Sequence, residues 1–244
     1  NIPVVILCGG TGTRLKEETE FKPKPMVTVG NKPILWHIMK IYSYYGFNNF
    51  ILCLGYKGQT IKNYFLNYKW LHSDFKMNVN KERTVYEMNH KYDDDFHITF
   101  VDTGEDTLTG ERIKMVEKYV LGDTFMMTYG DGVSNININT LLDFHIKQST
   151  IATLTGVHPT SKYGLVTMDE KKLVTSFAQK PRLNEYINGG FMVFKKTFFE
   201  YLKEGQMVEE ALEAVVAQQQ LSIYTHNDFW HCMDTYKDYK NLNK

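Results

Sequence analysis

The stretch VVILCGGTGTRL, residues 4–15, decides the fold, because an apolar run of strand type stops there at a series of glycines. The run predicts a buried β-strand, and the glycines predict a turn whose backbone a ligand can approach closely. In open α/β sheets, ligands bind beyond the carboxyl ends of the strands, where successive backbone N–H groups form a concavity for anions. The stretch therefore predicts a phosphate-binding turn after the first strand.

Short apolar runs recur beyond this strand and alternate with stretches of helical period at 33–45, 58–66 and 138–147. Such an alternation is typical of a mostly parallel sheet with helices on both of its faces. We therefore predict an α/β fold of Rossmann-like type.

The second half of the chain has a different pattern. Strand-like runs follow one another closely from 151 to 194, and helical patterns come after them at 196–203 and 207–219. The close spacing predicts that the sheet becomes mixed there, within a single domain formed by residues 1–244. The polar and aromatic segment at about 67–95 predicts an excursion from the sheet that ends in a solvated acidic turn.

The charges of the chain balance, with 28 Lys and Arg against 28 Asp and Glu. No overall field attracts nucleic acid or an anionic membrane, so neither is predicted as a partner, and a phosphate site must be built locally. No run approaches the ~18 apolar residues of a membrane span, and the N-terminus has no signal-peptide pattern, which predicts a cytoplasmic protein. The widely spaced Cys8, Cys53 and Cys232 predict reduced thiols rather than a disulfide framework.

Two familiar nucleotide-binding motifs do not fit the glycine turn. A dinucleotide fingerprint beginning at Gly10 needs a third glycine where Leu15 stands. A P-loop closes with Gly-Lys-Ser/Thr, whereas this turn closes with Thr13-Arg14-Leu15. NAD and P-loop ATPase chemistry are therefore disfavoured.

Cations accompany the turn instead. Arg14 stands at its mouth, and in the following KPKPMV, residues 22–27, prolines hold Lys22 and Lys24 on extended backbone. Because fixed cations beside a glycine nest compensate several phosphate charges, this pattern favours a polyphosphate ligand.

These residues resemble a known family, the sugar-1-phosphate nucleotidylyltransferases. Its signature, Gly-Gly-x-Gly-Thr-Arg-Leu followed by Pro-Lys-Pro-(Leu/Met)-Val, is matched by residues 9–15 and 23–27. Further stretches, among them VDTGEDTLTGERIK, YGDGV, INGGF and FWHCMDT, are similar to the glucose-1-phosphate cytidylyltransferase branch in particular. The resemblance runs from the first strand to about residue 240.

The resemblance implies an Mg²⁺-dependent enzyme that transfers CMP from CTP to a sugar 1-phosphate, above all α-D-glucose 1-phosphate, and releases CDP-glucose and pyrophosphate by in-line attack. It also implies a homo-oligomer whose product enters lipopolysaccharide O-antigen biosynthesis. Another sugar 1-phosphate and a non-catalytic nucleotide-sugar-binding protein stay open as alternatives. A glycosyltransferase is disfavoured, because YGDGV lacks the second Asp of an Asp-x-Asp metal motif.

The resemblance further implies the site residues. It makes Lys24 and Arg14 catalytic and makes Asp131 and Asp234 the Mg²⁺ ligands. The implied nucleotide-binding residues are Leu7, Gly9, Gly10, Gly12, Thr13, Arg14, Lys24, Asp102, Thr103, Thr109, Gly110, Gly130 and Asp131. The implied sugar-phosphate-binding residues, in a sugar-binding half from about 151, are Gln179, Lys180, Asn188 and Gly189.

Several of these residues leave a question for the structure. Asp131 could simply begin a turn, and Asp234 could merely cap the last helix. The family usually has Glu where Gln179 stands, which leaves the identity of the sugar open. A CTP enzyme also needs an acceptor for the exocyclic amine of cytosine, and Asp102, at the end of a predicted strand, is our candidate for it.

Overall fold

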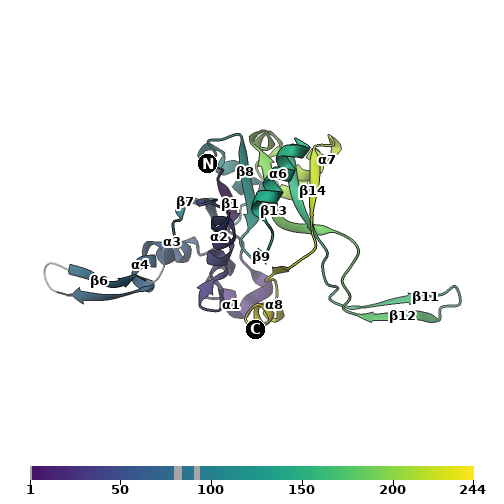
Figure 1. Cartoon of the computed structure of the whole chain (residues 1–244), viewed down its shortest axis with the longest axis horizontal. Helices are drawn as coiled ribbons and strands as arrows, with labels where there is room; N and C mark the ends of the chain where they lie inside the picture. Colours follow the sequence, from purple (N-terminus) through teal and green to yellow (C-terminus); the bar gives the residue numbers. More distant parts are fainter. Residues whose placement is uncertain (1, 80–83, 91–93) are drawn as a thin grey trace.

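The structure is a computed structural model and describes residues 2–79, 84–90 and 94–244. Its central element is a seven-stranded sheet in the order β14-β10-β13-β8-β1-β4-β7 (Figure 1). These strands are β1 (Val4–Leu7), β4 (Asn49–Leu54), β7 (His97–Asp102), β8 (Thr124–Tyr129), β10 (Ala152–Val157), β13 (Ile187–Lys195) and β14 (Leu221–His226). Because β13 is antiparallel to both neighbours and the other pairs are parallel, the sheet is mixed and mostly parallel, as predicted.

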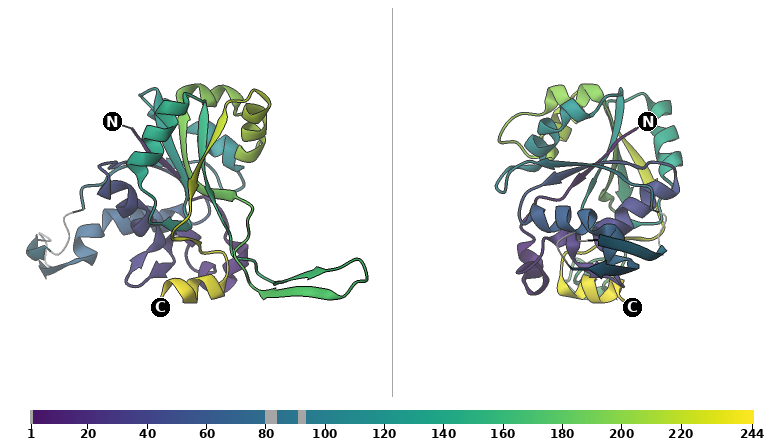
Figure 2. Two further views of the ribbon diagram at one scale, coloured as in Figure 1. Left: turned by 45° about the vertical axis from the view of Figure 1, so that its right-hand side comes forward. Right: turned by 90° about the vertical axis from the view of Figure 1, so that its left-hand side faces the viewer.

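Helices cover both faces of this sheet (Figure 2). One face carries α2 (Ile34–Tyr44), α3 (Gly58–Leu66) and α6 (Ile138–Gln148), and the other carries α5 (Thr109–Met115), the 3-10 helix η4 (Lys196–Tyr201) and α7 (Val208–Ala217). The shorter helical segments are η1 (Thr13–Leu15), α1 (Lys16–Thr19), η2 (Lys24–Met26), α4 (Tyr68–Leu71), η3 (Glu117–Tyr119) and α8 (Tyr236–Leu242). Within the described ranges, no helix combines the length and the hydrophobicity of a membrane span.

The first strand shows why the sheet needs helices on both sides. In β1, Val4 and Ile6 pack into the core beneath α2, whereas Val5 and Leu7 pack into the core beneath α5 and α7. Strand side chains alternate between faces, so a strand that is apolar at every position must be covered on both. The Rossmann-like prediction is therefore confirmed from the first strand outward.

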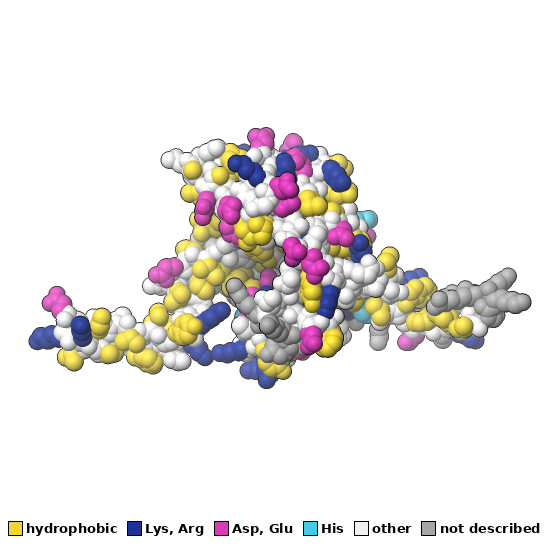
Figure 3. All heavy atoms as spheres, turned by 180° about the vertical axis from the view of Figure 1, so that it is seen from behind, with side chains coloured by type: hydrophobic (Ala, Val, Ile, Leu, Met, Phe, Trp, Pro, Cys, Tyr) yellow, Lys and Arg dark blue, Asp and Glu magenta, His cyan; other side chains and the backbone are white. Residues whose placement is uncertain are grey.

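Two antiparallel ribbons leave the body on opposite sides (Figure 1). One is β5 (Ser73–Asn78) with β6 (Thr84–His90), and the other is β11 (Gly164–Met168) with β12 (Val174–Gln179). Hence the strand-like runs between 151 and 194 do not all enter the sheet, and apolar side chains of β11 and β12 stay exposed (Figure 3). Short ladders join β2 (Thr28–Val29) to β3 (Lys32–Pro33) and β9 (Gly132–Ser134) to β15 (Trp230–Cys232).

The polar excursion ends only in part in the predicted solvated acidic turn, because Asp95 is 77% exposed whereas Asp94 is not. The side chain of Asp94 is only 4% exposed and accepts hydrogen bonds from Lys40 Nζ (2.7 Å), Trp36 Nε1 (2.9 Å) and Tyr68 OH (2.5 Å). Burial opposes its charge, but these donors, Lys40 foremost, outweigh burial and lower the pKa of Asp94. Asp94 therefore ties the base of the ribbon to α2, and Asp93 lies outside the described residues.

Candidate active site

The glycine turn after β1 is packed on one side and open on the other. Leu15 N–H closes it by donating to Gly12 O at 3.0 Å. Gly12 has φ +63°, and a Cβ there would lie 2.9 Å from Thr19 Cγ2 and 3.2 Å from Lys24 Cβ, so a side chain would be both strained and crowded. A Cβ at Gly10 would meet nothing within 4 Å. The backbone is thus accessible there, as an anion-binding turn requires.

Lys24 lies directly behind this turn, with its ammonium between two carboxylates. Its Nζ is 2.5 Å from Asp131 Oδ2 and 2.8 Å from Asp234 Oδ1. Burial disfavours the ammonium, but the carboxylates, Asp131 foremost, outweigh burial and raise the pKa of Lys24. Lys24 opens the 3-10 helix η2 rather than continuing the extended backbone predicted for it. Arg14 belongs to η1, and its side chain lies outside the described residues, so its catalytic role stays a prediction.

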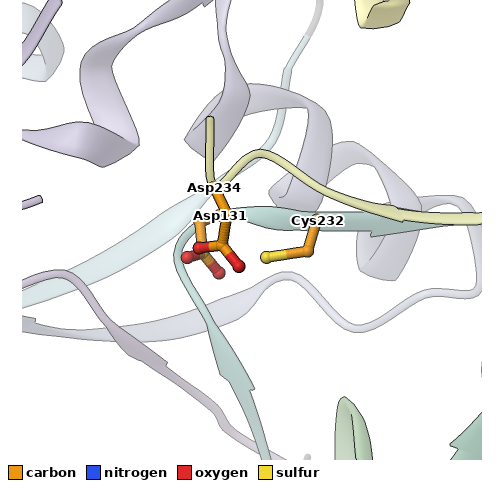
Figure 4. A group of neighbouring side chains, drawn as sticks. All are labelled: Asp131, Cys232 and Asp234. Carbon is orange, nitrogen blue, oxygen red and sulfur yellow. The ribbon is translucent and has the colours of Figure 1, made fainter. Parts of the chain in front are cut away.

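The short β9–β15 ladder sets the position of both carboxylates. Cys232 pairs with Gly132 across this ladder, and Met233 N–H donates to Asp131 O at 2.9 Å. Because side chains alternate along extended backbone, Cys232 and Asp234 face the site while Met233 enters the core. One oxygen of each carboxylate and the Cys232 Sγ all lie within 4.8 Å of one another (Figure 4).

The plainer alternatives do not account for these aspartates. Thr235 is the N-cap of α8 and forms a capping box with Asp238, so Asp234 is not the cap. Asp131 does lie in the turn between β8 and β9, but its carboxylate binds Lys24. The two carboxylates already hold a cation beside the first cavity, and carboxylate oxygens are donors that Mg²⁺ takes. The residues present therefore fit this ion.

Three cavities meet at Asp234, and Asp131 borders two of them. The first, of about 280 Å³, is bordered by the predicted residues Leu7, Gly10, Gly12, Thr13, Lys24, Thr109, Gly130 and Asp131. The second, of about 220 Å³, is bordered by Asn188, Gly189 and again Asp131. The third, of about 650 Å³, is bordered by Lys180. Site residues predicted from distant parts of the chain thus come together here.

The sequence profile of the nucleotidyl transferase family matches residues 3–244. The chain belongs to this family. It is 43% identical over 243 residues to a probable glucose-1-phosphate cytidylyltransferase of Bacillus subtilis, with 98% of this chain and 94% of that protein covered. It is also 43% identical to the glucose-1-phosphate cytidylyltransferase of Salmonella typhi, with 96% and 91% covered. The resemblance found in the sequence is confirmed, and the transferase is an enzyme of this kind.

Solved structures of the same fold are more distant in sequence. The transferase superposes on HddC from Yersinia pseudotuberculosis in complex with GMP-PN with a TM-score of 0.71 at 22% identity, covering 100% of this chain and 98% of that one. A putative glucose-1-phosphate thymidylyltransferase from Bacillus anthracis gives the same TM-score, 0.71, at 15% identity, covering 100% and 94%. Both neighbours confirm the fold class.

Beneath the glycine turn, the transferase has a buried arginine that the sequence analysis missed. Arg112, on α5, is 4% exposed and donates to the backbone oxygens of Gly9 (3.3 Å), Gly104 (2.6 Å) and Glu105 (2.9 Å). It also donates to Thr103 Oγ1 at 2.8 Å. A Cβ at Gly9 would lie 2.1 Å from Arg112 Nη1, which explains the glycine there. Arg112 thus joins the turn after β1 to the loop after β7. Its position in VDTGEDTLTGERIK, a stretch similar to the family, was the sequence feature that could have identified it.

Arg14 aside, whose side chain is not described, four residues of the predicted nucleotide set do not border the first cavity: Gly9, Asp102, Thr103 and Gly110. Thr103 is fully buried, and Gly110 N–H donates to Gln206 O at 3.0 Å, so both support the wall of the site. Asp102 is exposed, and its Oδ1 accepts from Gly104 N–H at 3.2 Å. Nucleotide contacts by these four residues stay predictions.

The third cavity of the transferase brings two lysines together. Lys180 follows β12, and Lys237 belongs to the first turn of α8. The neighbouring Lys237 lowers the pKa of Lys180, as expected for two like charges. An anion between them would relieve this repulsion, so the cavity suits a phosphate group. Lys237 is not among the predicted site residues, because DTYKDYK reads as a solvated helix start. Gln179 is among them, but it ends β12 and borders none of the three cavities.

Proposed function

We propose that the transferase moves CMP from CTP onto α-D-glucose 1-phosphate and releases CDP-glucose and pyrophosphate. The observation that carries this proposal is the convergence of three cavities on Asp234, which together with Asp131 holds the ammonium of Lys24. In the proposal, the first cavity holds the nucleotide, the second holds the sugar and the third holds the sugar phosphate. The choice of cytidine and glucose rests on the names of the relatives that are 43% identical.

The reaction brings two anions together. An oxygen of the sugar 1-phosphate attacks the α-phosphorus of CTP in line, and the bond from that phosphorus to the pyrophosphate oxygen breaks as the new bond forms. Charge accumulates on the phosphoryl oxygens, so fixed cations contribute most to the rate. We infer that Lys24 moves from its carboxylates to the α-phosphate, while Lys180, with Lys237 beside it, holds the incoming phosphate.

In this proposal Asp131 and Asp234 hold Mg²⁺. When bound, the ion supplies electrostatic stabilisation of the phosphoryl charge. The two carboxylates would hold the ion, and both border the nucleotide cavity and the sugar cavity. The β9–β15 ladder fixes their separation, which reduces the cost of positioning at the moment of reaction.

Substrate identity falls to residues around the cavities. We infer that Asn188 and Gly189 contact sugar hydroxyls, since they border the second cavity. Asp102 stays our candidate acceptor for the cytosine amine, and Asp102→Asn should reduce the preference for CTP over UTP. Gln179 adjoins Lys180 and replaces the usual Glu, so Gln179→Glu should change the selectivity among hexose 1-phosphates.

The exposed ribbon supports the proposal of a homo-oligomer. The apolar residues of β11, β12 and their connection that stay exposed are Leu165, Val166, Met168, Leu173, Val174 and Phe177 (Figure 3). Exposed apolar groups of this extent mark an interaction surface, and we infer that a second copy covers it. Sedimentation of Phe177→Asp against wild-type protein tests this inference, with a smaller species expected for the variant. We place the oligomer in the cytoplasm, where it would supply CDP-glucose for O-antigen biosynthesis.

Pyrophosphate release tests the proposed function. The assay combines CTP, UTP, dTTP or ATP with a panel of hexose 1-phosphates in the presence of Mg²⁺. We expect release with CTP and glucose 1-phosphate, loss of release in Lys24→Met, and retention in Lys22→Met, since Lys22 pairs with Glu18 at 3.4 Å instead. Release with CTP and a different sugar would replace glucose in the proposal. If folded protein binds CTP but releases no pyrophosphate with any pair of substrates, the proposed catalysis is wrong and the protein only binds the nucleotide.

A further inference from the structure

A thiol adjoins the proposed cation site. The Sγ of Cys232 lies within 4.8 Å of a carboxylate oxygen of Asp131 and of Asp234, and Figure 4 shows it directed toward both. Cys232 also borders the second and third cavities, so small solutes can reach it. Cys53 differs, because it is 0% exposed and borders none of the three cavities, whereas Cys8 borders the first cavity but is only 1% exposed.

This donor set is more than Mg²⁺ uses. Mg²⁺ binds oxygen ligands, and a sulfur atom contributes nothing to its affinity. Zn²⁺ and Cd²⁺, by contrast, combine thiolate with carboxylate ligands, and thiolate sulfur selects them. We propose that Cys232 is a third, sulfur ligand at the Asp131–Asp234 site, which makes this site bind thiophilic divalent cations such as Zn²⁺ and Cd²⁺ more tightly than Mg²⁺.

The geometry needs little adjustment. Around a tetrahedral Zn²⁺ with the usual bond lengths, ligand atoms lie about 3.3–3.7 Å apart. The three donor atoms here are at most 4.8 Å apart, so side-chain rotations that move each atom by about 1 Å would bring them to these distances. Backbone pairing already holds Cys232 opposite Gly132 and Met233 against Asp131, so the ligands do not have to be collected from mobile segments.

The ammonium of Lys24 shows that the carboxylates attract a cation at this point. When a thiophilic ion replaces it, the metal–sulfur bond forms as the thiol proton leaves to water, and water completes the coordination. The inference rests on the proposed function only in taking Asp131 and Asp234 as cation ligands. A cation held through sulfur occupies the place of Mg²⁺, so these ions should inhibit the transferase.

Cadmium titration of the full chain, without nucleotide or sugar phosphate, tests the proposal. We expect one equivalent of Cd²⁺ to produce a sulfur-to-metal charge-transfer band in the ultraviolet. Cys232→Ser keeps the size of the side chain, and it should lose the band and bind Cd²⁺ at least tenfold more weakly, with unchanged affinity for Mn²⁺. Cys53→Ala, which removes a buried thiol that borders none of the three cavities, should keep the band. Absence of the band in wild-type protein, or its persistence in Cys232→Ser, would overturn the proposal.

Alkylation provides a measurement that needs no variant. Cd²⁺ at one equivalent should slow the alkylation of Cys232 in wild-type protein, as read by peptide mass spectrometry, and unprotected labelling would refute sulfur ligation even if Cys232→Ser did not fold. The cadmium measurements are independent of the pyrophosphate assay. An active enzyme that shows no band would refute only the sulfur ligand. An inactive protein that shows the band would support the sulfur ligand and refute the proposed catalysis.

Discussion

Lys24→Met should change cation binding and catalysis in opposite directions. The ammonium of Lys24 lies 2.5 Å and 2.8 Å from the two carboxylates that we assign to Mg²⁺, so a cation entering the free enzyme has to displace it. All three side chains are less than a third exposed, at 14%, 23% and 32%. A charge-assisted hydrogen bond contributes about 1.5–3 kcal/mol, and part of that is recovered from water when it breaks.

From these values we expect Lys24→Met to tighten Mn²⁺ binding, without nucleotide, by ~1.4–2.8 kcal/mol, a ~10- to 100-fold lower Kd. The same variant removes a fixed cation from the transition state, which should lower kcat by about 10²–10³-fold. Electron paramagnetic resonance of free Mn²⁺ measures the first quantity and pyrophosphate release measures the second. Lys22→Met, whose lysine pairs with Glu18, should leave both unchanged.

Tighter Mn²⁺ binding together with a lower kcat in Lys24→Met would distinguish competition between Lys24 and the metal from simple damage to the site. A distorted site would lose both Mn²⁺ affinity and activity. A Kd for Mn²⁺ that rises, or that stays within twofold of the wild-type value, would refute the idea that Lys24 and the metal compete for Asp131 and Asp234.

Three further predictions follow from single side chains. Burial lowers the pKa of His145 to about 4, below its unfolded value of 6.5. The contribution of neutral His145 to the free energy of unfolding should therefore be fully present above pH 6.5 and fall by ~1.4 kcal/mol per pH unit toward pH 4. In urea unfolding, His145→Asn should flatten this decline. Lys237→Gln should raise the KM for the sugar 1-phosphate about tenfold with little change in the KM for CTP, whereas an equal effect of Lys240→Gln would argue for general surface charge. Gly12→Ala should lower the free energy of unfolding by about 1–2 kcal/mol, because φ there is +63°. Gly10→Ala should leave the free energy of unfolding unchanged and weaken CTP binding. Equal melting temperatures for the two variants would contradict this distinction.

The glycine turn and the helical stretches could be predicted from the sequence, because each depends on residues that are neighbours in the chain. The glycine turn, Lys24 and the apolar strand before them follow from backbone freedom, side-chain charge and alternation of faces, all of which act over a few residues. The same holds for the helical stretches of α2, α3 and α6, whose predicted bounds agree with the structure to within one residue at either end.

Other features depended on contacts that no local pattern encodes. Arg112 reads as a surface residue of an amphipathic helix until the loops after β1 and β7 close over it. Asp94 reads as a solvated turn until α2 supplies Lys40 and Trp36. The ribbon β11–β12 reads as part of the sheet, because strand propensity does not say which strand will be its neighbour.

The sequence by itself determined the fold class, the glycine turn after the first strand and the family, because these follow from periodicity and from short motifs with a direct physical meaning. Only the tertiary structure decided that Asp131 and Asp234 hold Lys24 between them, and that Cys232 and Lys237 join the site. Lys24 and Asp234 alone are separated by 210 positions along the chain. They meet because the antiparallel pairing of β15 with β9 returns the end of the chain to the turn after β8, and such long-range pairing is set by the packing of the whole core.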